Sequence, residues 1–321
     1  MVSTLEGRAP KFGVLFAPPI GPEPVVEVAK RAEALGFDAF YVADHFNEVI
    51  SPVPTLAAVA TCTSLRVGAY MLANDLRHPA LVARDFAALD VLSEGRVELG
   101  MGAGWWPADY RAVGLDMDRP GNRISRLREA VELVRACWTA QEVNHRGEWY
   151  RAHLNPMFRT VQRPHPPIIV GGGGPKLLRA AAELADVVSI GISLASGRRA
   201  DMPASNAAAT FEEVERKVRT ARRESRRSAA IDMLLFRVAV DERSSELVDS
   251  VAAAHAIPPE QVMASPYMQV GSLDEVVAGF ERLVRLGVDS VVVRSSDMEA
   301  GAQVKEALMA KPPPVRACSS V

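Results

Sequence analysis

The sequence is poor in cysteine and lacks any long apolar run. Its three cysteines, Cys62, Cys137 and Cys318, are far apart and show no CxxC spacing, which argues against a disulfide framework or a zinc site. No stretch reaches the roughly 18 apolar residues of a membrane span, and the first residues lack the apolar core of a signal peptide. We therefore expect a cytoplasmic protein without a membrane partner.

An excess of one charge is also missing. The 321 residues carry 37 basic and 39 acidic side chains, which gives a net charge of −2. No basic run interleaved with aromatics marks a nucleic-acid surface, and the densest basic segment, 216–227, has the helical spacing of a solvated face. The six histidines show no metal-ligand spacing. Nucleic acid and metal are therefore not expected partners.

Apolar runs alternate with helix-period segments along the whole chain. The predicted strands lie at 12–16, 39–43, 66–71, 97–100, 167–170, 186–191, 233–240 and 290–293. Each is followed by a helix or an irregular crossover, and no composition shift marks a linker, so the pattern predicts one (β/α)8 TIM barrel of the α/β class. We expect a single domain over 1–310 and a flexible tail at 311–321. Insertions are expected at 141–166, as a loop or hairpin, and at 192–210, as a long mobile loop.

The carboxyl ends of the strands hold the candidates for chemistry, because (β/α)8 barrels place their active sites at that face. Four glycines separate an apolar strand from Pro175: Gly171, Gly172, Gly173 and Gly174. Their N–H groups predict a phosphate cradle at a helix N-terminus, with a tight strand-to-helix turn as the alternative. Three residues at the end of the next strand are placed to donate to the same group: Gly191, Ile192 and Ser193.

A histidine and several aromatic residues follow other strands. His45 comes after the second strand and beside Asp44, where it can exchange a proton with a ligand; a structural histidine is the alternative. Trp105 and Trp106 follow a glycine-rich exit and are expected to line a substrate pocket, with a core role as the alternative. Phe16, at the end of the first strand, is a further pocket candidate.

The segment GMGAGWW at 100–106 is not a dinucleotide-binding fingerprint. Trp-Trp-Pro follows its glycines in place of a helix, and no acid lies at the expected distance. Gly102 and Gly104 instead allow a flat ligand to approach the backbone. The strand exit at 70–75 has room for a bulge against such a ligand, which the local pattern alone does not establish.

Five motifs together resemble the luciferase-like monooxygenase superfamily. They are collinear over nearly the whole chain: DHF at 44–46, RHP at 77–79, LDVLSEGRVELGMGAGW at 89–105, ACW at 136–138 and PPIIVGGGGPKLLRAAAELADVVSI at 166–190. The resemblance implies a (β/α)8 barrel that binds FMN or the deazaflavin F420. The GxGxGW form with NDxRHP is similar to the branch of F420-dependent oxidoreductases. A homodimer is implied by the resemblance alone.

The resemblance also assigns roles to residues. It implies a non-proline cis peptide at Tyr70–Met71, in a bulge that backs the flavin-like ring. It matches the active-site histidine of the family to His45 and a ring-contacting acid to Asp44. The cofactor site that it implies comprises Asp44, Tyr70, Met71, Asn74, Gly102, Gly104 and the two glycine-rich loops described above.

Two positions depart from the sugar-phosphate dehydrogenases of the F420 branch. Trp105 stands where those enzymes carry an acidic Glu, and Val49 stands where they carry a Trp after the DHF motif. The departures imply that glucose 6-phosphate is not the substrate, and they leave His45 as the proton-transfer candidate.

The expected function is that of an F420-dependent oxidoreductase, acting as a reductase. It would transfer a hydride between C5 of the deazaflavin and a C=C, C=N or C=O group of a small organic substrate. Two alternatives stay open: an FMN-dependent monooxygenase that uses O2 and reduced flavin, and a non-catalytic flavin-binding barrel. F420 has carbon at position 5 and forms no useful peroxide, so the cofactor decides the reaction class.

Overall fold

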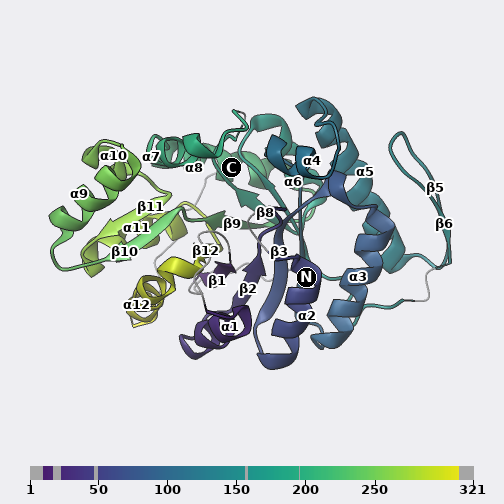
Figure 1. Ribbon diagram of the computed structural model, residues 1–321, viewed down its shortest axis with the longest axis horizontal. Coiled ribbons are helices and arrows are strands. Elements are labelled where there is room, and N and C mark those ends of the chain that lie inside the picture. The colour runs from purple at the N-terminus through teal and green to yellow at the C-terminus, as the bar shows by residue number, and fades with distance from the viewer. Residues whose placement is uncertain (1–9, 17–22, 47–49, 156–157, 195, 311–321) are drawn as a thin grey trace.

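The barrel predicted from the sequence is present. The computed structural model describes residues 10–16, 23–46, 50–155, 158–194 and 196–310, so the expected tail at 311–321 lies outside the described residues. Eight parallel strands close in the order β1-β12-β9-β8-β7-β4-β3-β2 (Figure 1). Across the described ranges, no helix has the length and apolar character needed to cross a membrane.

Helices surround the barrel on its outer face (Figure 1). The barrel strands are β1 (Lys11–Phe16), β2 (Ala39–Val42), β3 (Arg66–Ala73), β4 (Val97–Gly102), β7 (Ile168–Gly172), β8 (Val187–Ile190), β9 (Ala230–Leu234) and β12 (Ser290–Arg294). The surrounding helices are α1 (Val25–Ala34), α2 (Pro52–Cys62), α3 (Pro79–Leu92), α5 (Pro120–Thr139), α6 (Pro175–Leu184), α8 (Phe211–Glu224), α11 (Leu273–Arg285) and α12 (Met298–Met309).

The helix α11 shows why these segments form helices that pack on the strands. Ser272 and Glu275 make a capping box, in which each side chain accepts the backbone N–H of the other residue. The apolar residues that follow recur at helical spacing and are buried: Val276, Val277, Phe280, Leu283 and Val284. The polar residues between them face outward, so one side of the helix supplies the core.

The single strand expected at 233–240 is wrong. The barrel strand β9 ends at Leu234, and β10 (Arg237–Val240) leaves the barrel to pair in parallel with β11 (Met268–Gly271). The Leu235 N–H still donates to the Val292 carbonyl, whereas the Phe236 N–H donates to the Tyr267 carbonyl. Apart from Arg237 the run 233–240 is apolar, so its pattern does not reveal where the backbone changes partner.

The two insertions differ in outcome. The insertion predicted at 141–166 does leave the barrel in its described part, as an antiparallel hairpin of β5 (Val143–Arg146) and β6 (Arg151–Leu154) (Figure 1). The irregular loop expected at 192–210 is wrong for 199–207, which form the turn η2 (Arg199–Asp201) and the helix α7 (Met202–Ala207). Ala207 packs in a small apolar cluster with Met268 of β11 and side chains of α9 (Ser244–His255) and α10 (Pro259–Ala264). This tertiary packing orders a segment whose composition shows no helical period.

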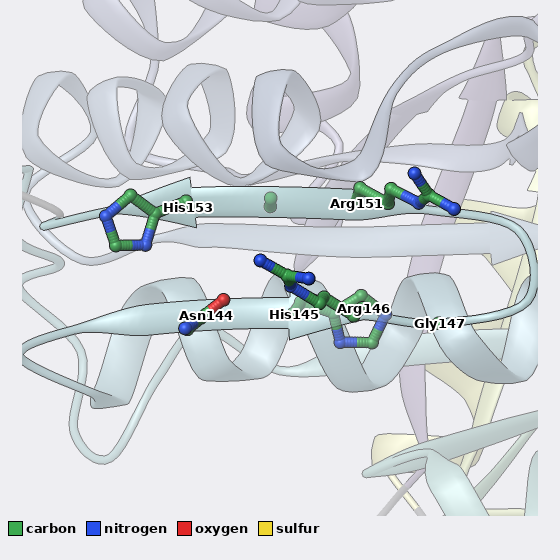
Figure 2. Close-up of a pocket in the computed structure, with 7 residues that line it drawn as sticks. Asn144, His145, Arg146, Gly147, Arg151 and His153 are labelled. Carbon is green, nitrogen blue, oxygen red and sulfur yellow. The ribbon is translucent and has the colours of Figure 1, made fainter.

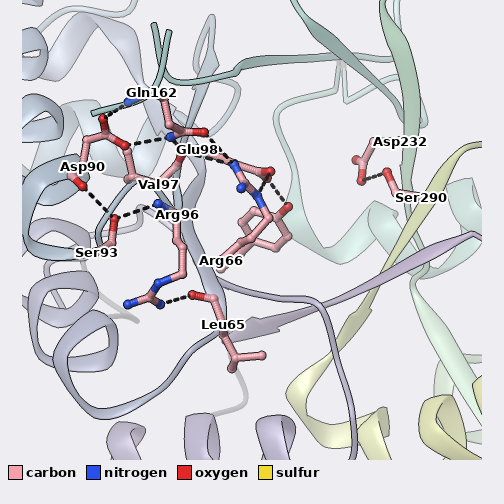
Figure 3. A network of polar contacts seen from close by, with 11 residues as sticks. Leu65, Arg66, Asp90, Ser93, Arg96, Val97, Glu98, Gln162, Asp232 and Ser290 are labelled. Carbon is pink, nitrogen blue, oxygen red and sulfur yellow. Dashed lines mark hydrogen bonds and ion pairs between the residues drawn. The ribbon is translucent and has the colours of Figure 1, made fainter. Parts of the chain in front are cut away.

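Polar side chains occupy the interior of the barrel. Tyr41 donates to Glu98 at 2.6 Å, and Arg66 pairs with the same carboxylate at 2.5 Å. Tyr70 donates to the Asp232 carboxylate. Ser290 donates to the other oxygen of Asp232 at 3.2 Å (Figure 3). A cavity of about 80 Å³ lies between these groups and the amino ends of the strands. Burial raises the pKa of Asp232 to about 6.

We expect Asp232→Asn to remove a pH dependence of the free energy of unfolding between about pH 4 and pH 6. Folded Asp232 keeps its proton up to about pH 6, whereas the unfolded residue loses it near pH 4. The native state binds more protons in this window, so the stability that Asp232 contributes is fully present below about pH 4. It falls by about 3 kcal/mol as the pH rises through the folded pKa.

Urea denaturation of the wild type and the variant across this pH range measures the effect. The exposed substitution Asp249→Asn is the control. The free-energy difference between wild type and Asp232→Asn should change with pH, while the difference for Asp249→Asn should not. Parallel curves for wild type and Asp232→Asn would contradict the prediction.

Candidate functional site

A histidine and two tryptophans meet at the carboxyl end of the barrel. His45 follows β2, and Trp105 and Trp106 follow β4. The centroid of the His45 ring lies 5.8 Å from that of Trp105 and 5.4 Å from that of Trp106, nearly perpendicular to both. The two indoles stack at 6.0 Å. The structure thus brings together the predicted catalytic residue and two predicted pocket residues.

Asp109 orients His45, and the sequence analysis missed it. Its Oδ2 lies 2.8 Å from Nδ1 of His45, and its Oδ1 accepts the Phe46 N–H at 3.0 Å. An ionised carboxylate only accepts hydrogen bonds, so Nδ1 carries the proton and Nε2 is left for a ligand. Asp109 is buried in the first turn of α4 (Pro107–Ala112). The only signal in the sequence is an acid soon after Pro107, which is common at any helix start.

Asp44 ties the end of β2 to the end of β3. Its two oxygens accept from the Arg77 guanidinium at 2.5 and 2.9 Å, and Oδ2 also accepts the Ala73 N–H at 3.0 Å. Such a bidentate pair on a buried carboxylate is strong and fixes geometry. The described contacts therefore give Asp44 a supporting role, and its contact with a cofactor ring stays a prediction.

The exit of β3 carries the bulge that the resemblance implies. The Tyr70–Met71 peptide is cis, and the pairing of β3 with β4 shifts register between Ala69 and Leu72. The Tyr70 side chain points into the barrel, where it donates to Asp232. The bulge is therefore held in place by the hydrogen bond between the Tyr70 side chain and Asp232 in the barrel interior.

Glycines of β4 and β7 make room for the Met71 side chain. A Cβ on Gly100 would lie 2.9 Å from the Met71 sulfur, and a Cβ on Gly171 would lie 2.9 Å from its terminal methyl group. A Cβ on Gly102 would lie 3.4 Å from the Met71 Cβ. The packing of Met71 thus explains Gly171, whereas a Cβ on Gly102 would make only an ordinary contact, and direct contact of either glycine with a cofactor stays a prediction.

Packing contacts also account for the residue types at Gly104 and Phe16. Gly104 has φ +69°, and a Cβ there would lie 2.1 Å from the hydroxyl of Tyr110. Phe16 is 3% exposed and packs against Phe40 at 6.1 Å between ring centroids, within the main core. These contacts make both residues structural, and their roles at a ligand stay predictions.

The exits of β7 and β8 touch backbone to backbone. A Cβ on Gly173 would lie 1.7 Å from the Ile192 carbonyl oxygen, so only glycine fits there. The Gly191 N–H donates to the Gly172 carbonyl at 3.3 Å. Four N–H groups of these exits donate to no described residue: those of Gly173, Gly174, Ile192 and Ser193. The helix α6 starts directly after Gly174, so this donor set fits a phosphate.

Asn74 presents a buried acceptor without a partner. The residue is 3% exposed, and its amide donates to the Tyr150 hydroxyl at 3.1 Å and to Asp75 at 3.3 Å. Its Oδ1 accepts no hydrogen bond from any residue that the structure describes. Leaving such an atom unpaired costs about 1–3 kcal/mol, so a ligand donor at this point would be favoured. Asn74 therefore fits its predicted role at a cofactor.

Two arginines that lie over aromatic rings were not among the predicted residues. The Arg199 guanidinium lies 5.6 Å from the centroid of a Trp106 ring, and the Arg294 guanidinium lies 5.6 Å from that of Phe236. Burial lowers the pKa of both side chains, and Arg199 and Arg237 lower the pKa of Arg294 further, while Asp297 opposes this. Arg199 therefore places a positive charge beside Trp106, and Arg294 is close enough to Arg199 to interact with it electrostatically.

A second hollow of the structure lies on the β5–β6 hairpin and away from these residues (Figure 2). Its volume is about 610 Å³, and its lining comes from the hairpin alone: Asn144, His145, Arg146, Gly147, Arg151, Ala152 and His153. His145 pairs with Glu129 of α5 at 2.8 Å, which holds the hairpin to the barrel. No grouping of three or more His, Cys, Asp or Glu within the described ranges has the arrangement to hold a metal ion.

The family model of luciferase-like monooxygenases matches residues 11–290 of this sequence. The chain belongs to the luciferase-like monooxygenase family. It is 30% identical over 305 residues to the F420-dependent glucose-6-phosphate dehydrogenase of Segniliparus rotundus, which covers 84% of this chain and 87% of that enzyme. The enzyme of the same name from Amycolatopsis mediterranei is 32% identical over 175 residues. In that alignment the chain spans about half of its relative, 52% of its length.

Solved structures with other activities share the fold. The coenzyme F420-dependent tetrahydromethanopterin reductase of Methanopyrus kandleri superposes with a TM-score of 0.71 at 22% identity, covering 93% of this chain and 98% of that one. The EDTA monooxygenase of Chelativorans sp. BNC1 superposes with a TM-score of 0.76 at 15% identity, covering 98% and 96%. At these identities the likeness concerns the fold alone.

Proposed function

We propose that this chain is an F420-dependent oxidoreductase that acts as a reductase. It transfers a hydride between C5 of the deazaflavin and a C=C, C=N or C=O group of a small organic substrate. The observation that carries the proposal is the placement of the His45–Asp109 pair at the mouth of a barrel that also has the Tyr70–Met71 bulge. The F420-dependent activities in the names of the aligned relatives support the choice of cofactor.

The described residues fit a flat, phosphate-bearing cofactor. The four free N–H groups at the β7 and β8 exits would hold the phosphate, and the bulge would lie against the ring. Asn74 Oδ1 would accept a hydrogen bond from the ring or its polyol chain. When bound, F420 supplies the hydride chemistry at its C5 atom.

Five side chains would serve the substrate. His45 Nε2 gives or takes the proton that accompanies hydride transfer, because Asp109 holds Nδ1 and sets the orientation of the ring. Trp105 and Trp106 present apolar faces next to His45, which exclude water from the reacting atoms. The cationic side chains of Arg199 and Arg294 favour a substrate with a negatively charged group.

Glucose 6-phosphate is not the substrate that we propose, although relatives are named for it. Trp105 stands at the position of the acidic Glu of the sugar-phosphate dehydrogenases, so the acid of that reaction is missing. The second departure, Val49, lies outside the described residues.

A titration of the apo-protein with F420 and with FMN tests the proposal. We expect F420 to bind at least about tenfold tighter, which corresponds to about 1.4 kcal/mol. Reduced F420 is then mixed with a panel of enones, imines and ketones, including acids and their methyl esters. Preferred FMN binding with O2-dependent turnover would favour a monooxygenase instead. Tight F420 binding without oxidation by any member of the panel would favour a non-catalytic binding protein.

We also propose that the chain forms a homodimer. Three large apolar side chains on α3 are exposed: Leu81, Val91 and Leu92. Exposed apolar side chains of this kind support a dimer in which a second copy of the chain covers α3. Light scattering coupled to size-exclusion chromatography measures the mass, and a monomer at micromolar concentration would contradict the proposal.

A further inference from the structure

Lys217 lies directly behind the exit of β8. It belongs to α8 and is only 6% exposed, unlike the arginines that follow on this helix. Its ammonium donates to the Gly191 carbonyl at 2.6 Å and pairs with Glu213, one turn earlier, at 2.7 Å. Burying a lysine is costly, so a buried ammonium must be well paired. One of the two partners of the Lys217 ammonium is the backbone carbonyl of Gly191, at the exit of β8.

That hydrogen bond fixes the direction of the next N–H group. The peptide between Gly191 and Ile192 is not among the cis bonds of the described chain, so its C=O and N–H point in opposite directions. Because the carbonyl points back at Lys217, the Ile192 N–H points away from α8. It donates to no described residue. A Cβ on Gly173 would lie 2.7 Å from the Ser193 nitrogen, so the backbones of the two exits lie side by side.

We propose that Lys217 is a positioning residue for the cofactor phosphate, since it holds the Gly191–Ile192 peptide so that the Ile192 N–H faces that group. The inference rests on the proposed function. A cation on the carbonyl also polarises the peptide and strengthens its N–H as a donor. Glu213 neutralises the charge of Lys217. Lys217 therefore acts mainly by orienting the Ile192 N–H, and contributes little to the electrostatic potential at the phosphate.

The test compares F420 with its phosphate-free fragment, the deazaflavin with a bare ribityl chain, by calorimetric titration. We expect Lys217→Met to weaken F420 binding by about 10- to 30-fold, as loss of a charged hydrogen bond would. Binding of the phosphate-free fragment should change by less than about threefold, because it does not use the Ile192 N–H. The control Lys30→Met removes an exposed lysine of α1 and should alter neither affinity.

Each other outcome is decisive. Equal losses for both probes would make Lys217 a merely structural residue, and unchanged F420 affinity would overturn the proposal. Failure of the wild type to bind either probe would instead overturn the proposed function. If Lys217→Met does not fold, the wild type is titrated with inorganic phosphate. The amide resonances of Gly173 and Ile192 should then shift, and unmoved resonances would overturn the proposal.

Discussion

Replacement of His45 by alanine is expected to lower kcat for reduction of the best substrate by about 100- to 10,000-fold, the range of general acid–base catalysis. Affinity for the cofactor should change by less than about threefold, because the substitution removes no group that we place at the phosphate or the ring. The ring of His45 contacts both Trp105 and Trp106, which line the proposed substrate pocket.

Asp109→Asn tests the His45–Asp109 pair by changing the carboxylate instead of the histidine. A neutral amide at this position does not stabilise the positively charged ring that gives the proton in reduction, and by donating to Nδ1 it also reverses the ring tautomer. We expect kcat to fall by about 100-fold or more, while the fold is retained because Oδ1 can still accept the Phe46 N–H. Steady-state and single-turnover kinetics measure both variants.

The control for both variants is His153→Ala, which removes an exposed histidine of the β5–β6 hairpin. It should leave kcat within about twofold of the wild type. Full turnover by His45→Ala would exclude the proposed proton transfer by this residue.

Gly173→Ala is the second substitution with a large expected effect. The added Cβ would lie 1.7 Å from the Ile192 carbonyl oxygen and 2.7 Å from the Ser193 nitrogen, both backbone atoms that cannot rotate away. The exits of β7 and β8 must therefore separate, at a cost of about 1–3 kcal/mol. Because the donors that we propose for the phosphate lie on both exits, we expect F420 affinity to fall by about 10- to 100-fold.

Calorimetric titration measures that affinity, and circular dichroism checks that the barrel is retained. Gly121→Ala is the matched control, since nothing lies within 4 Å of a Cβ there and the residue is in the helix α5. Alanine at this helical position should stabilise the chain by up to about 1 kcal/mol and leave affinity unchanged. Wild-type F420 affinity in Gly173→Ala would contradict the idea that both exits hold one phosphate.

The pattern of the sequence was sufficient to predict the barrel and the location of the site within it. Strand runs, helical periods and the run of four glycines are local features of the sequence. Because barrel active sites lie at the carboxyl ends of the strands, these features also indicate where the candidate site lies in the fold. The same local reading was wrong for 233–240 and for 199–207. In both segments, packing against β11 and its helices decided the outcome, and no local pattern reports that packing.

By itself, the sequence determined the fold, the family and the choice of His45, Trp105, Trp106 and the two glycine-rich exits, because each is read from neighbours along the chain. Only the tertiary structure decided which distant side chains complete that site. Asp109 reaches His45, Lys217 reaches Gly191, and Arg199 reaches Trp106 through closure of the barrel and the return of loops over its mouth. An acid or a lysine on a helix reads as an ordinary surface residue until its partner, many residues away, is known.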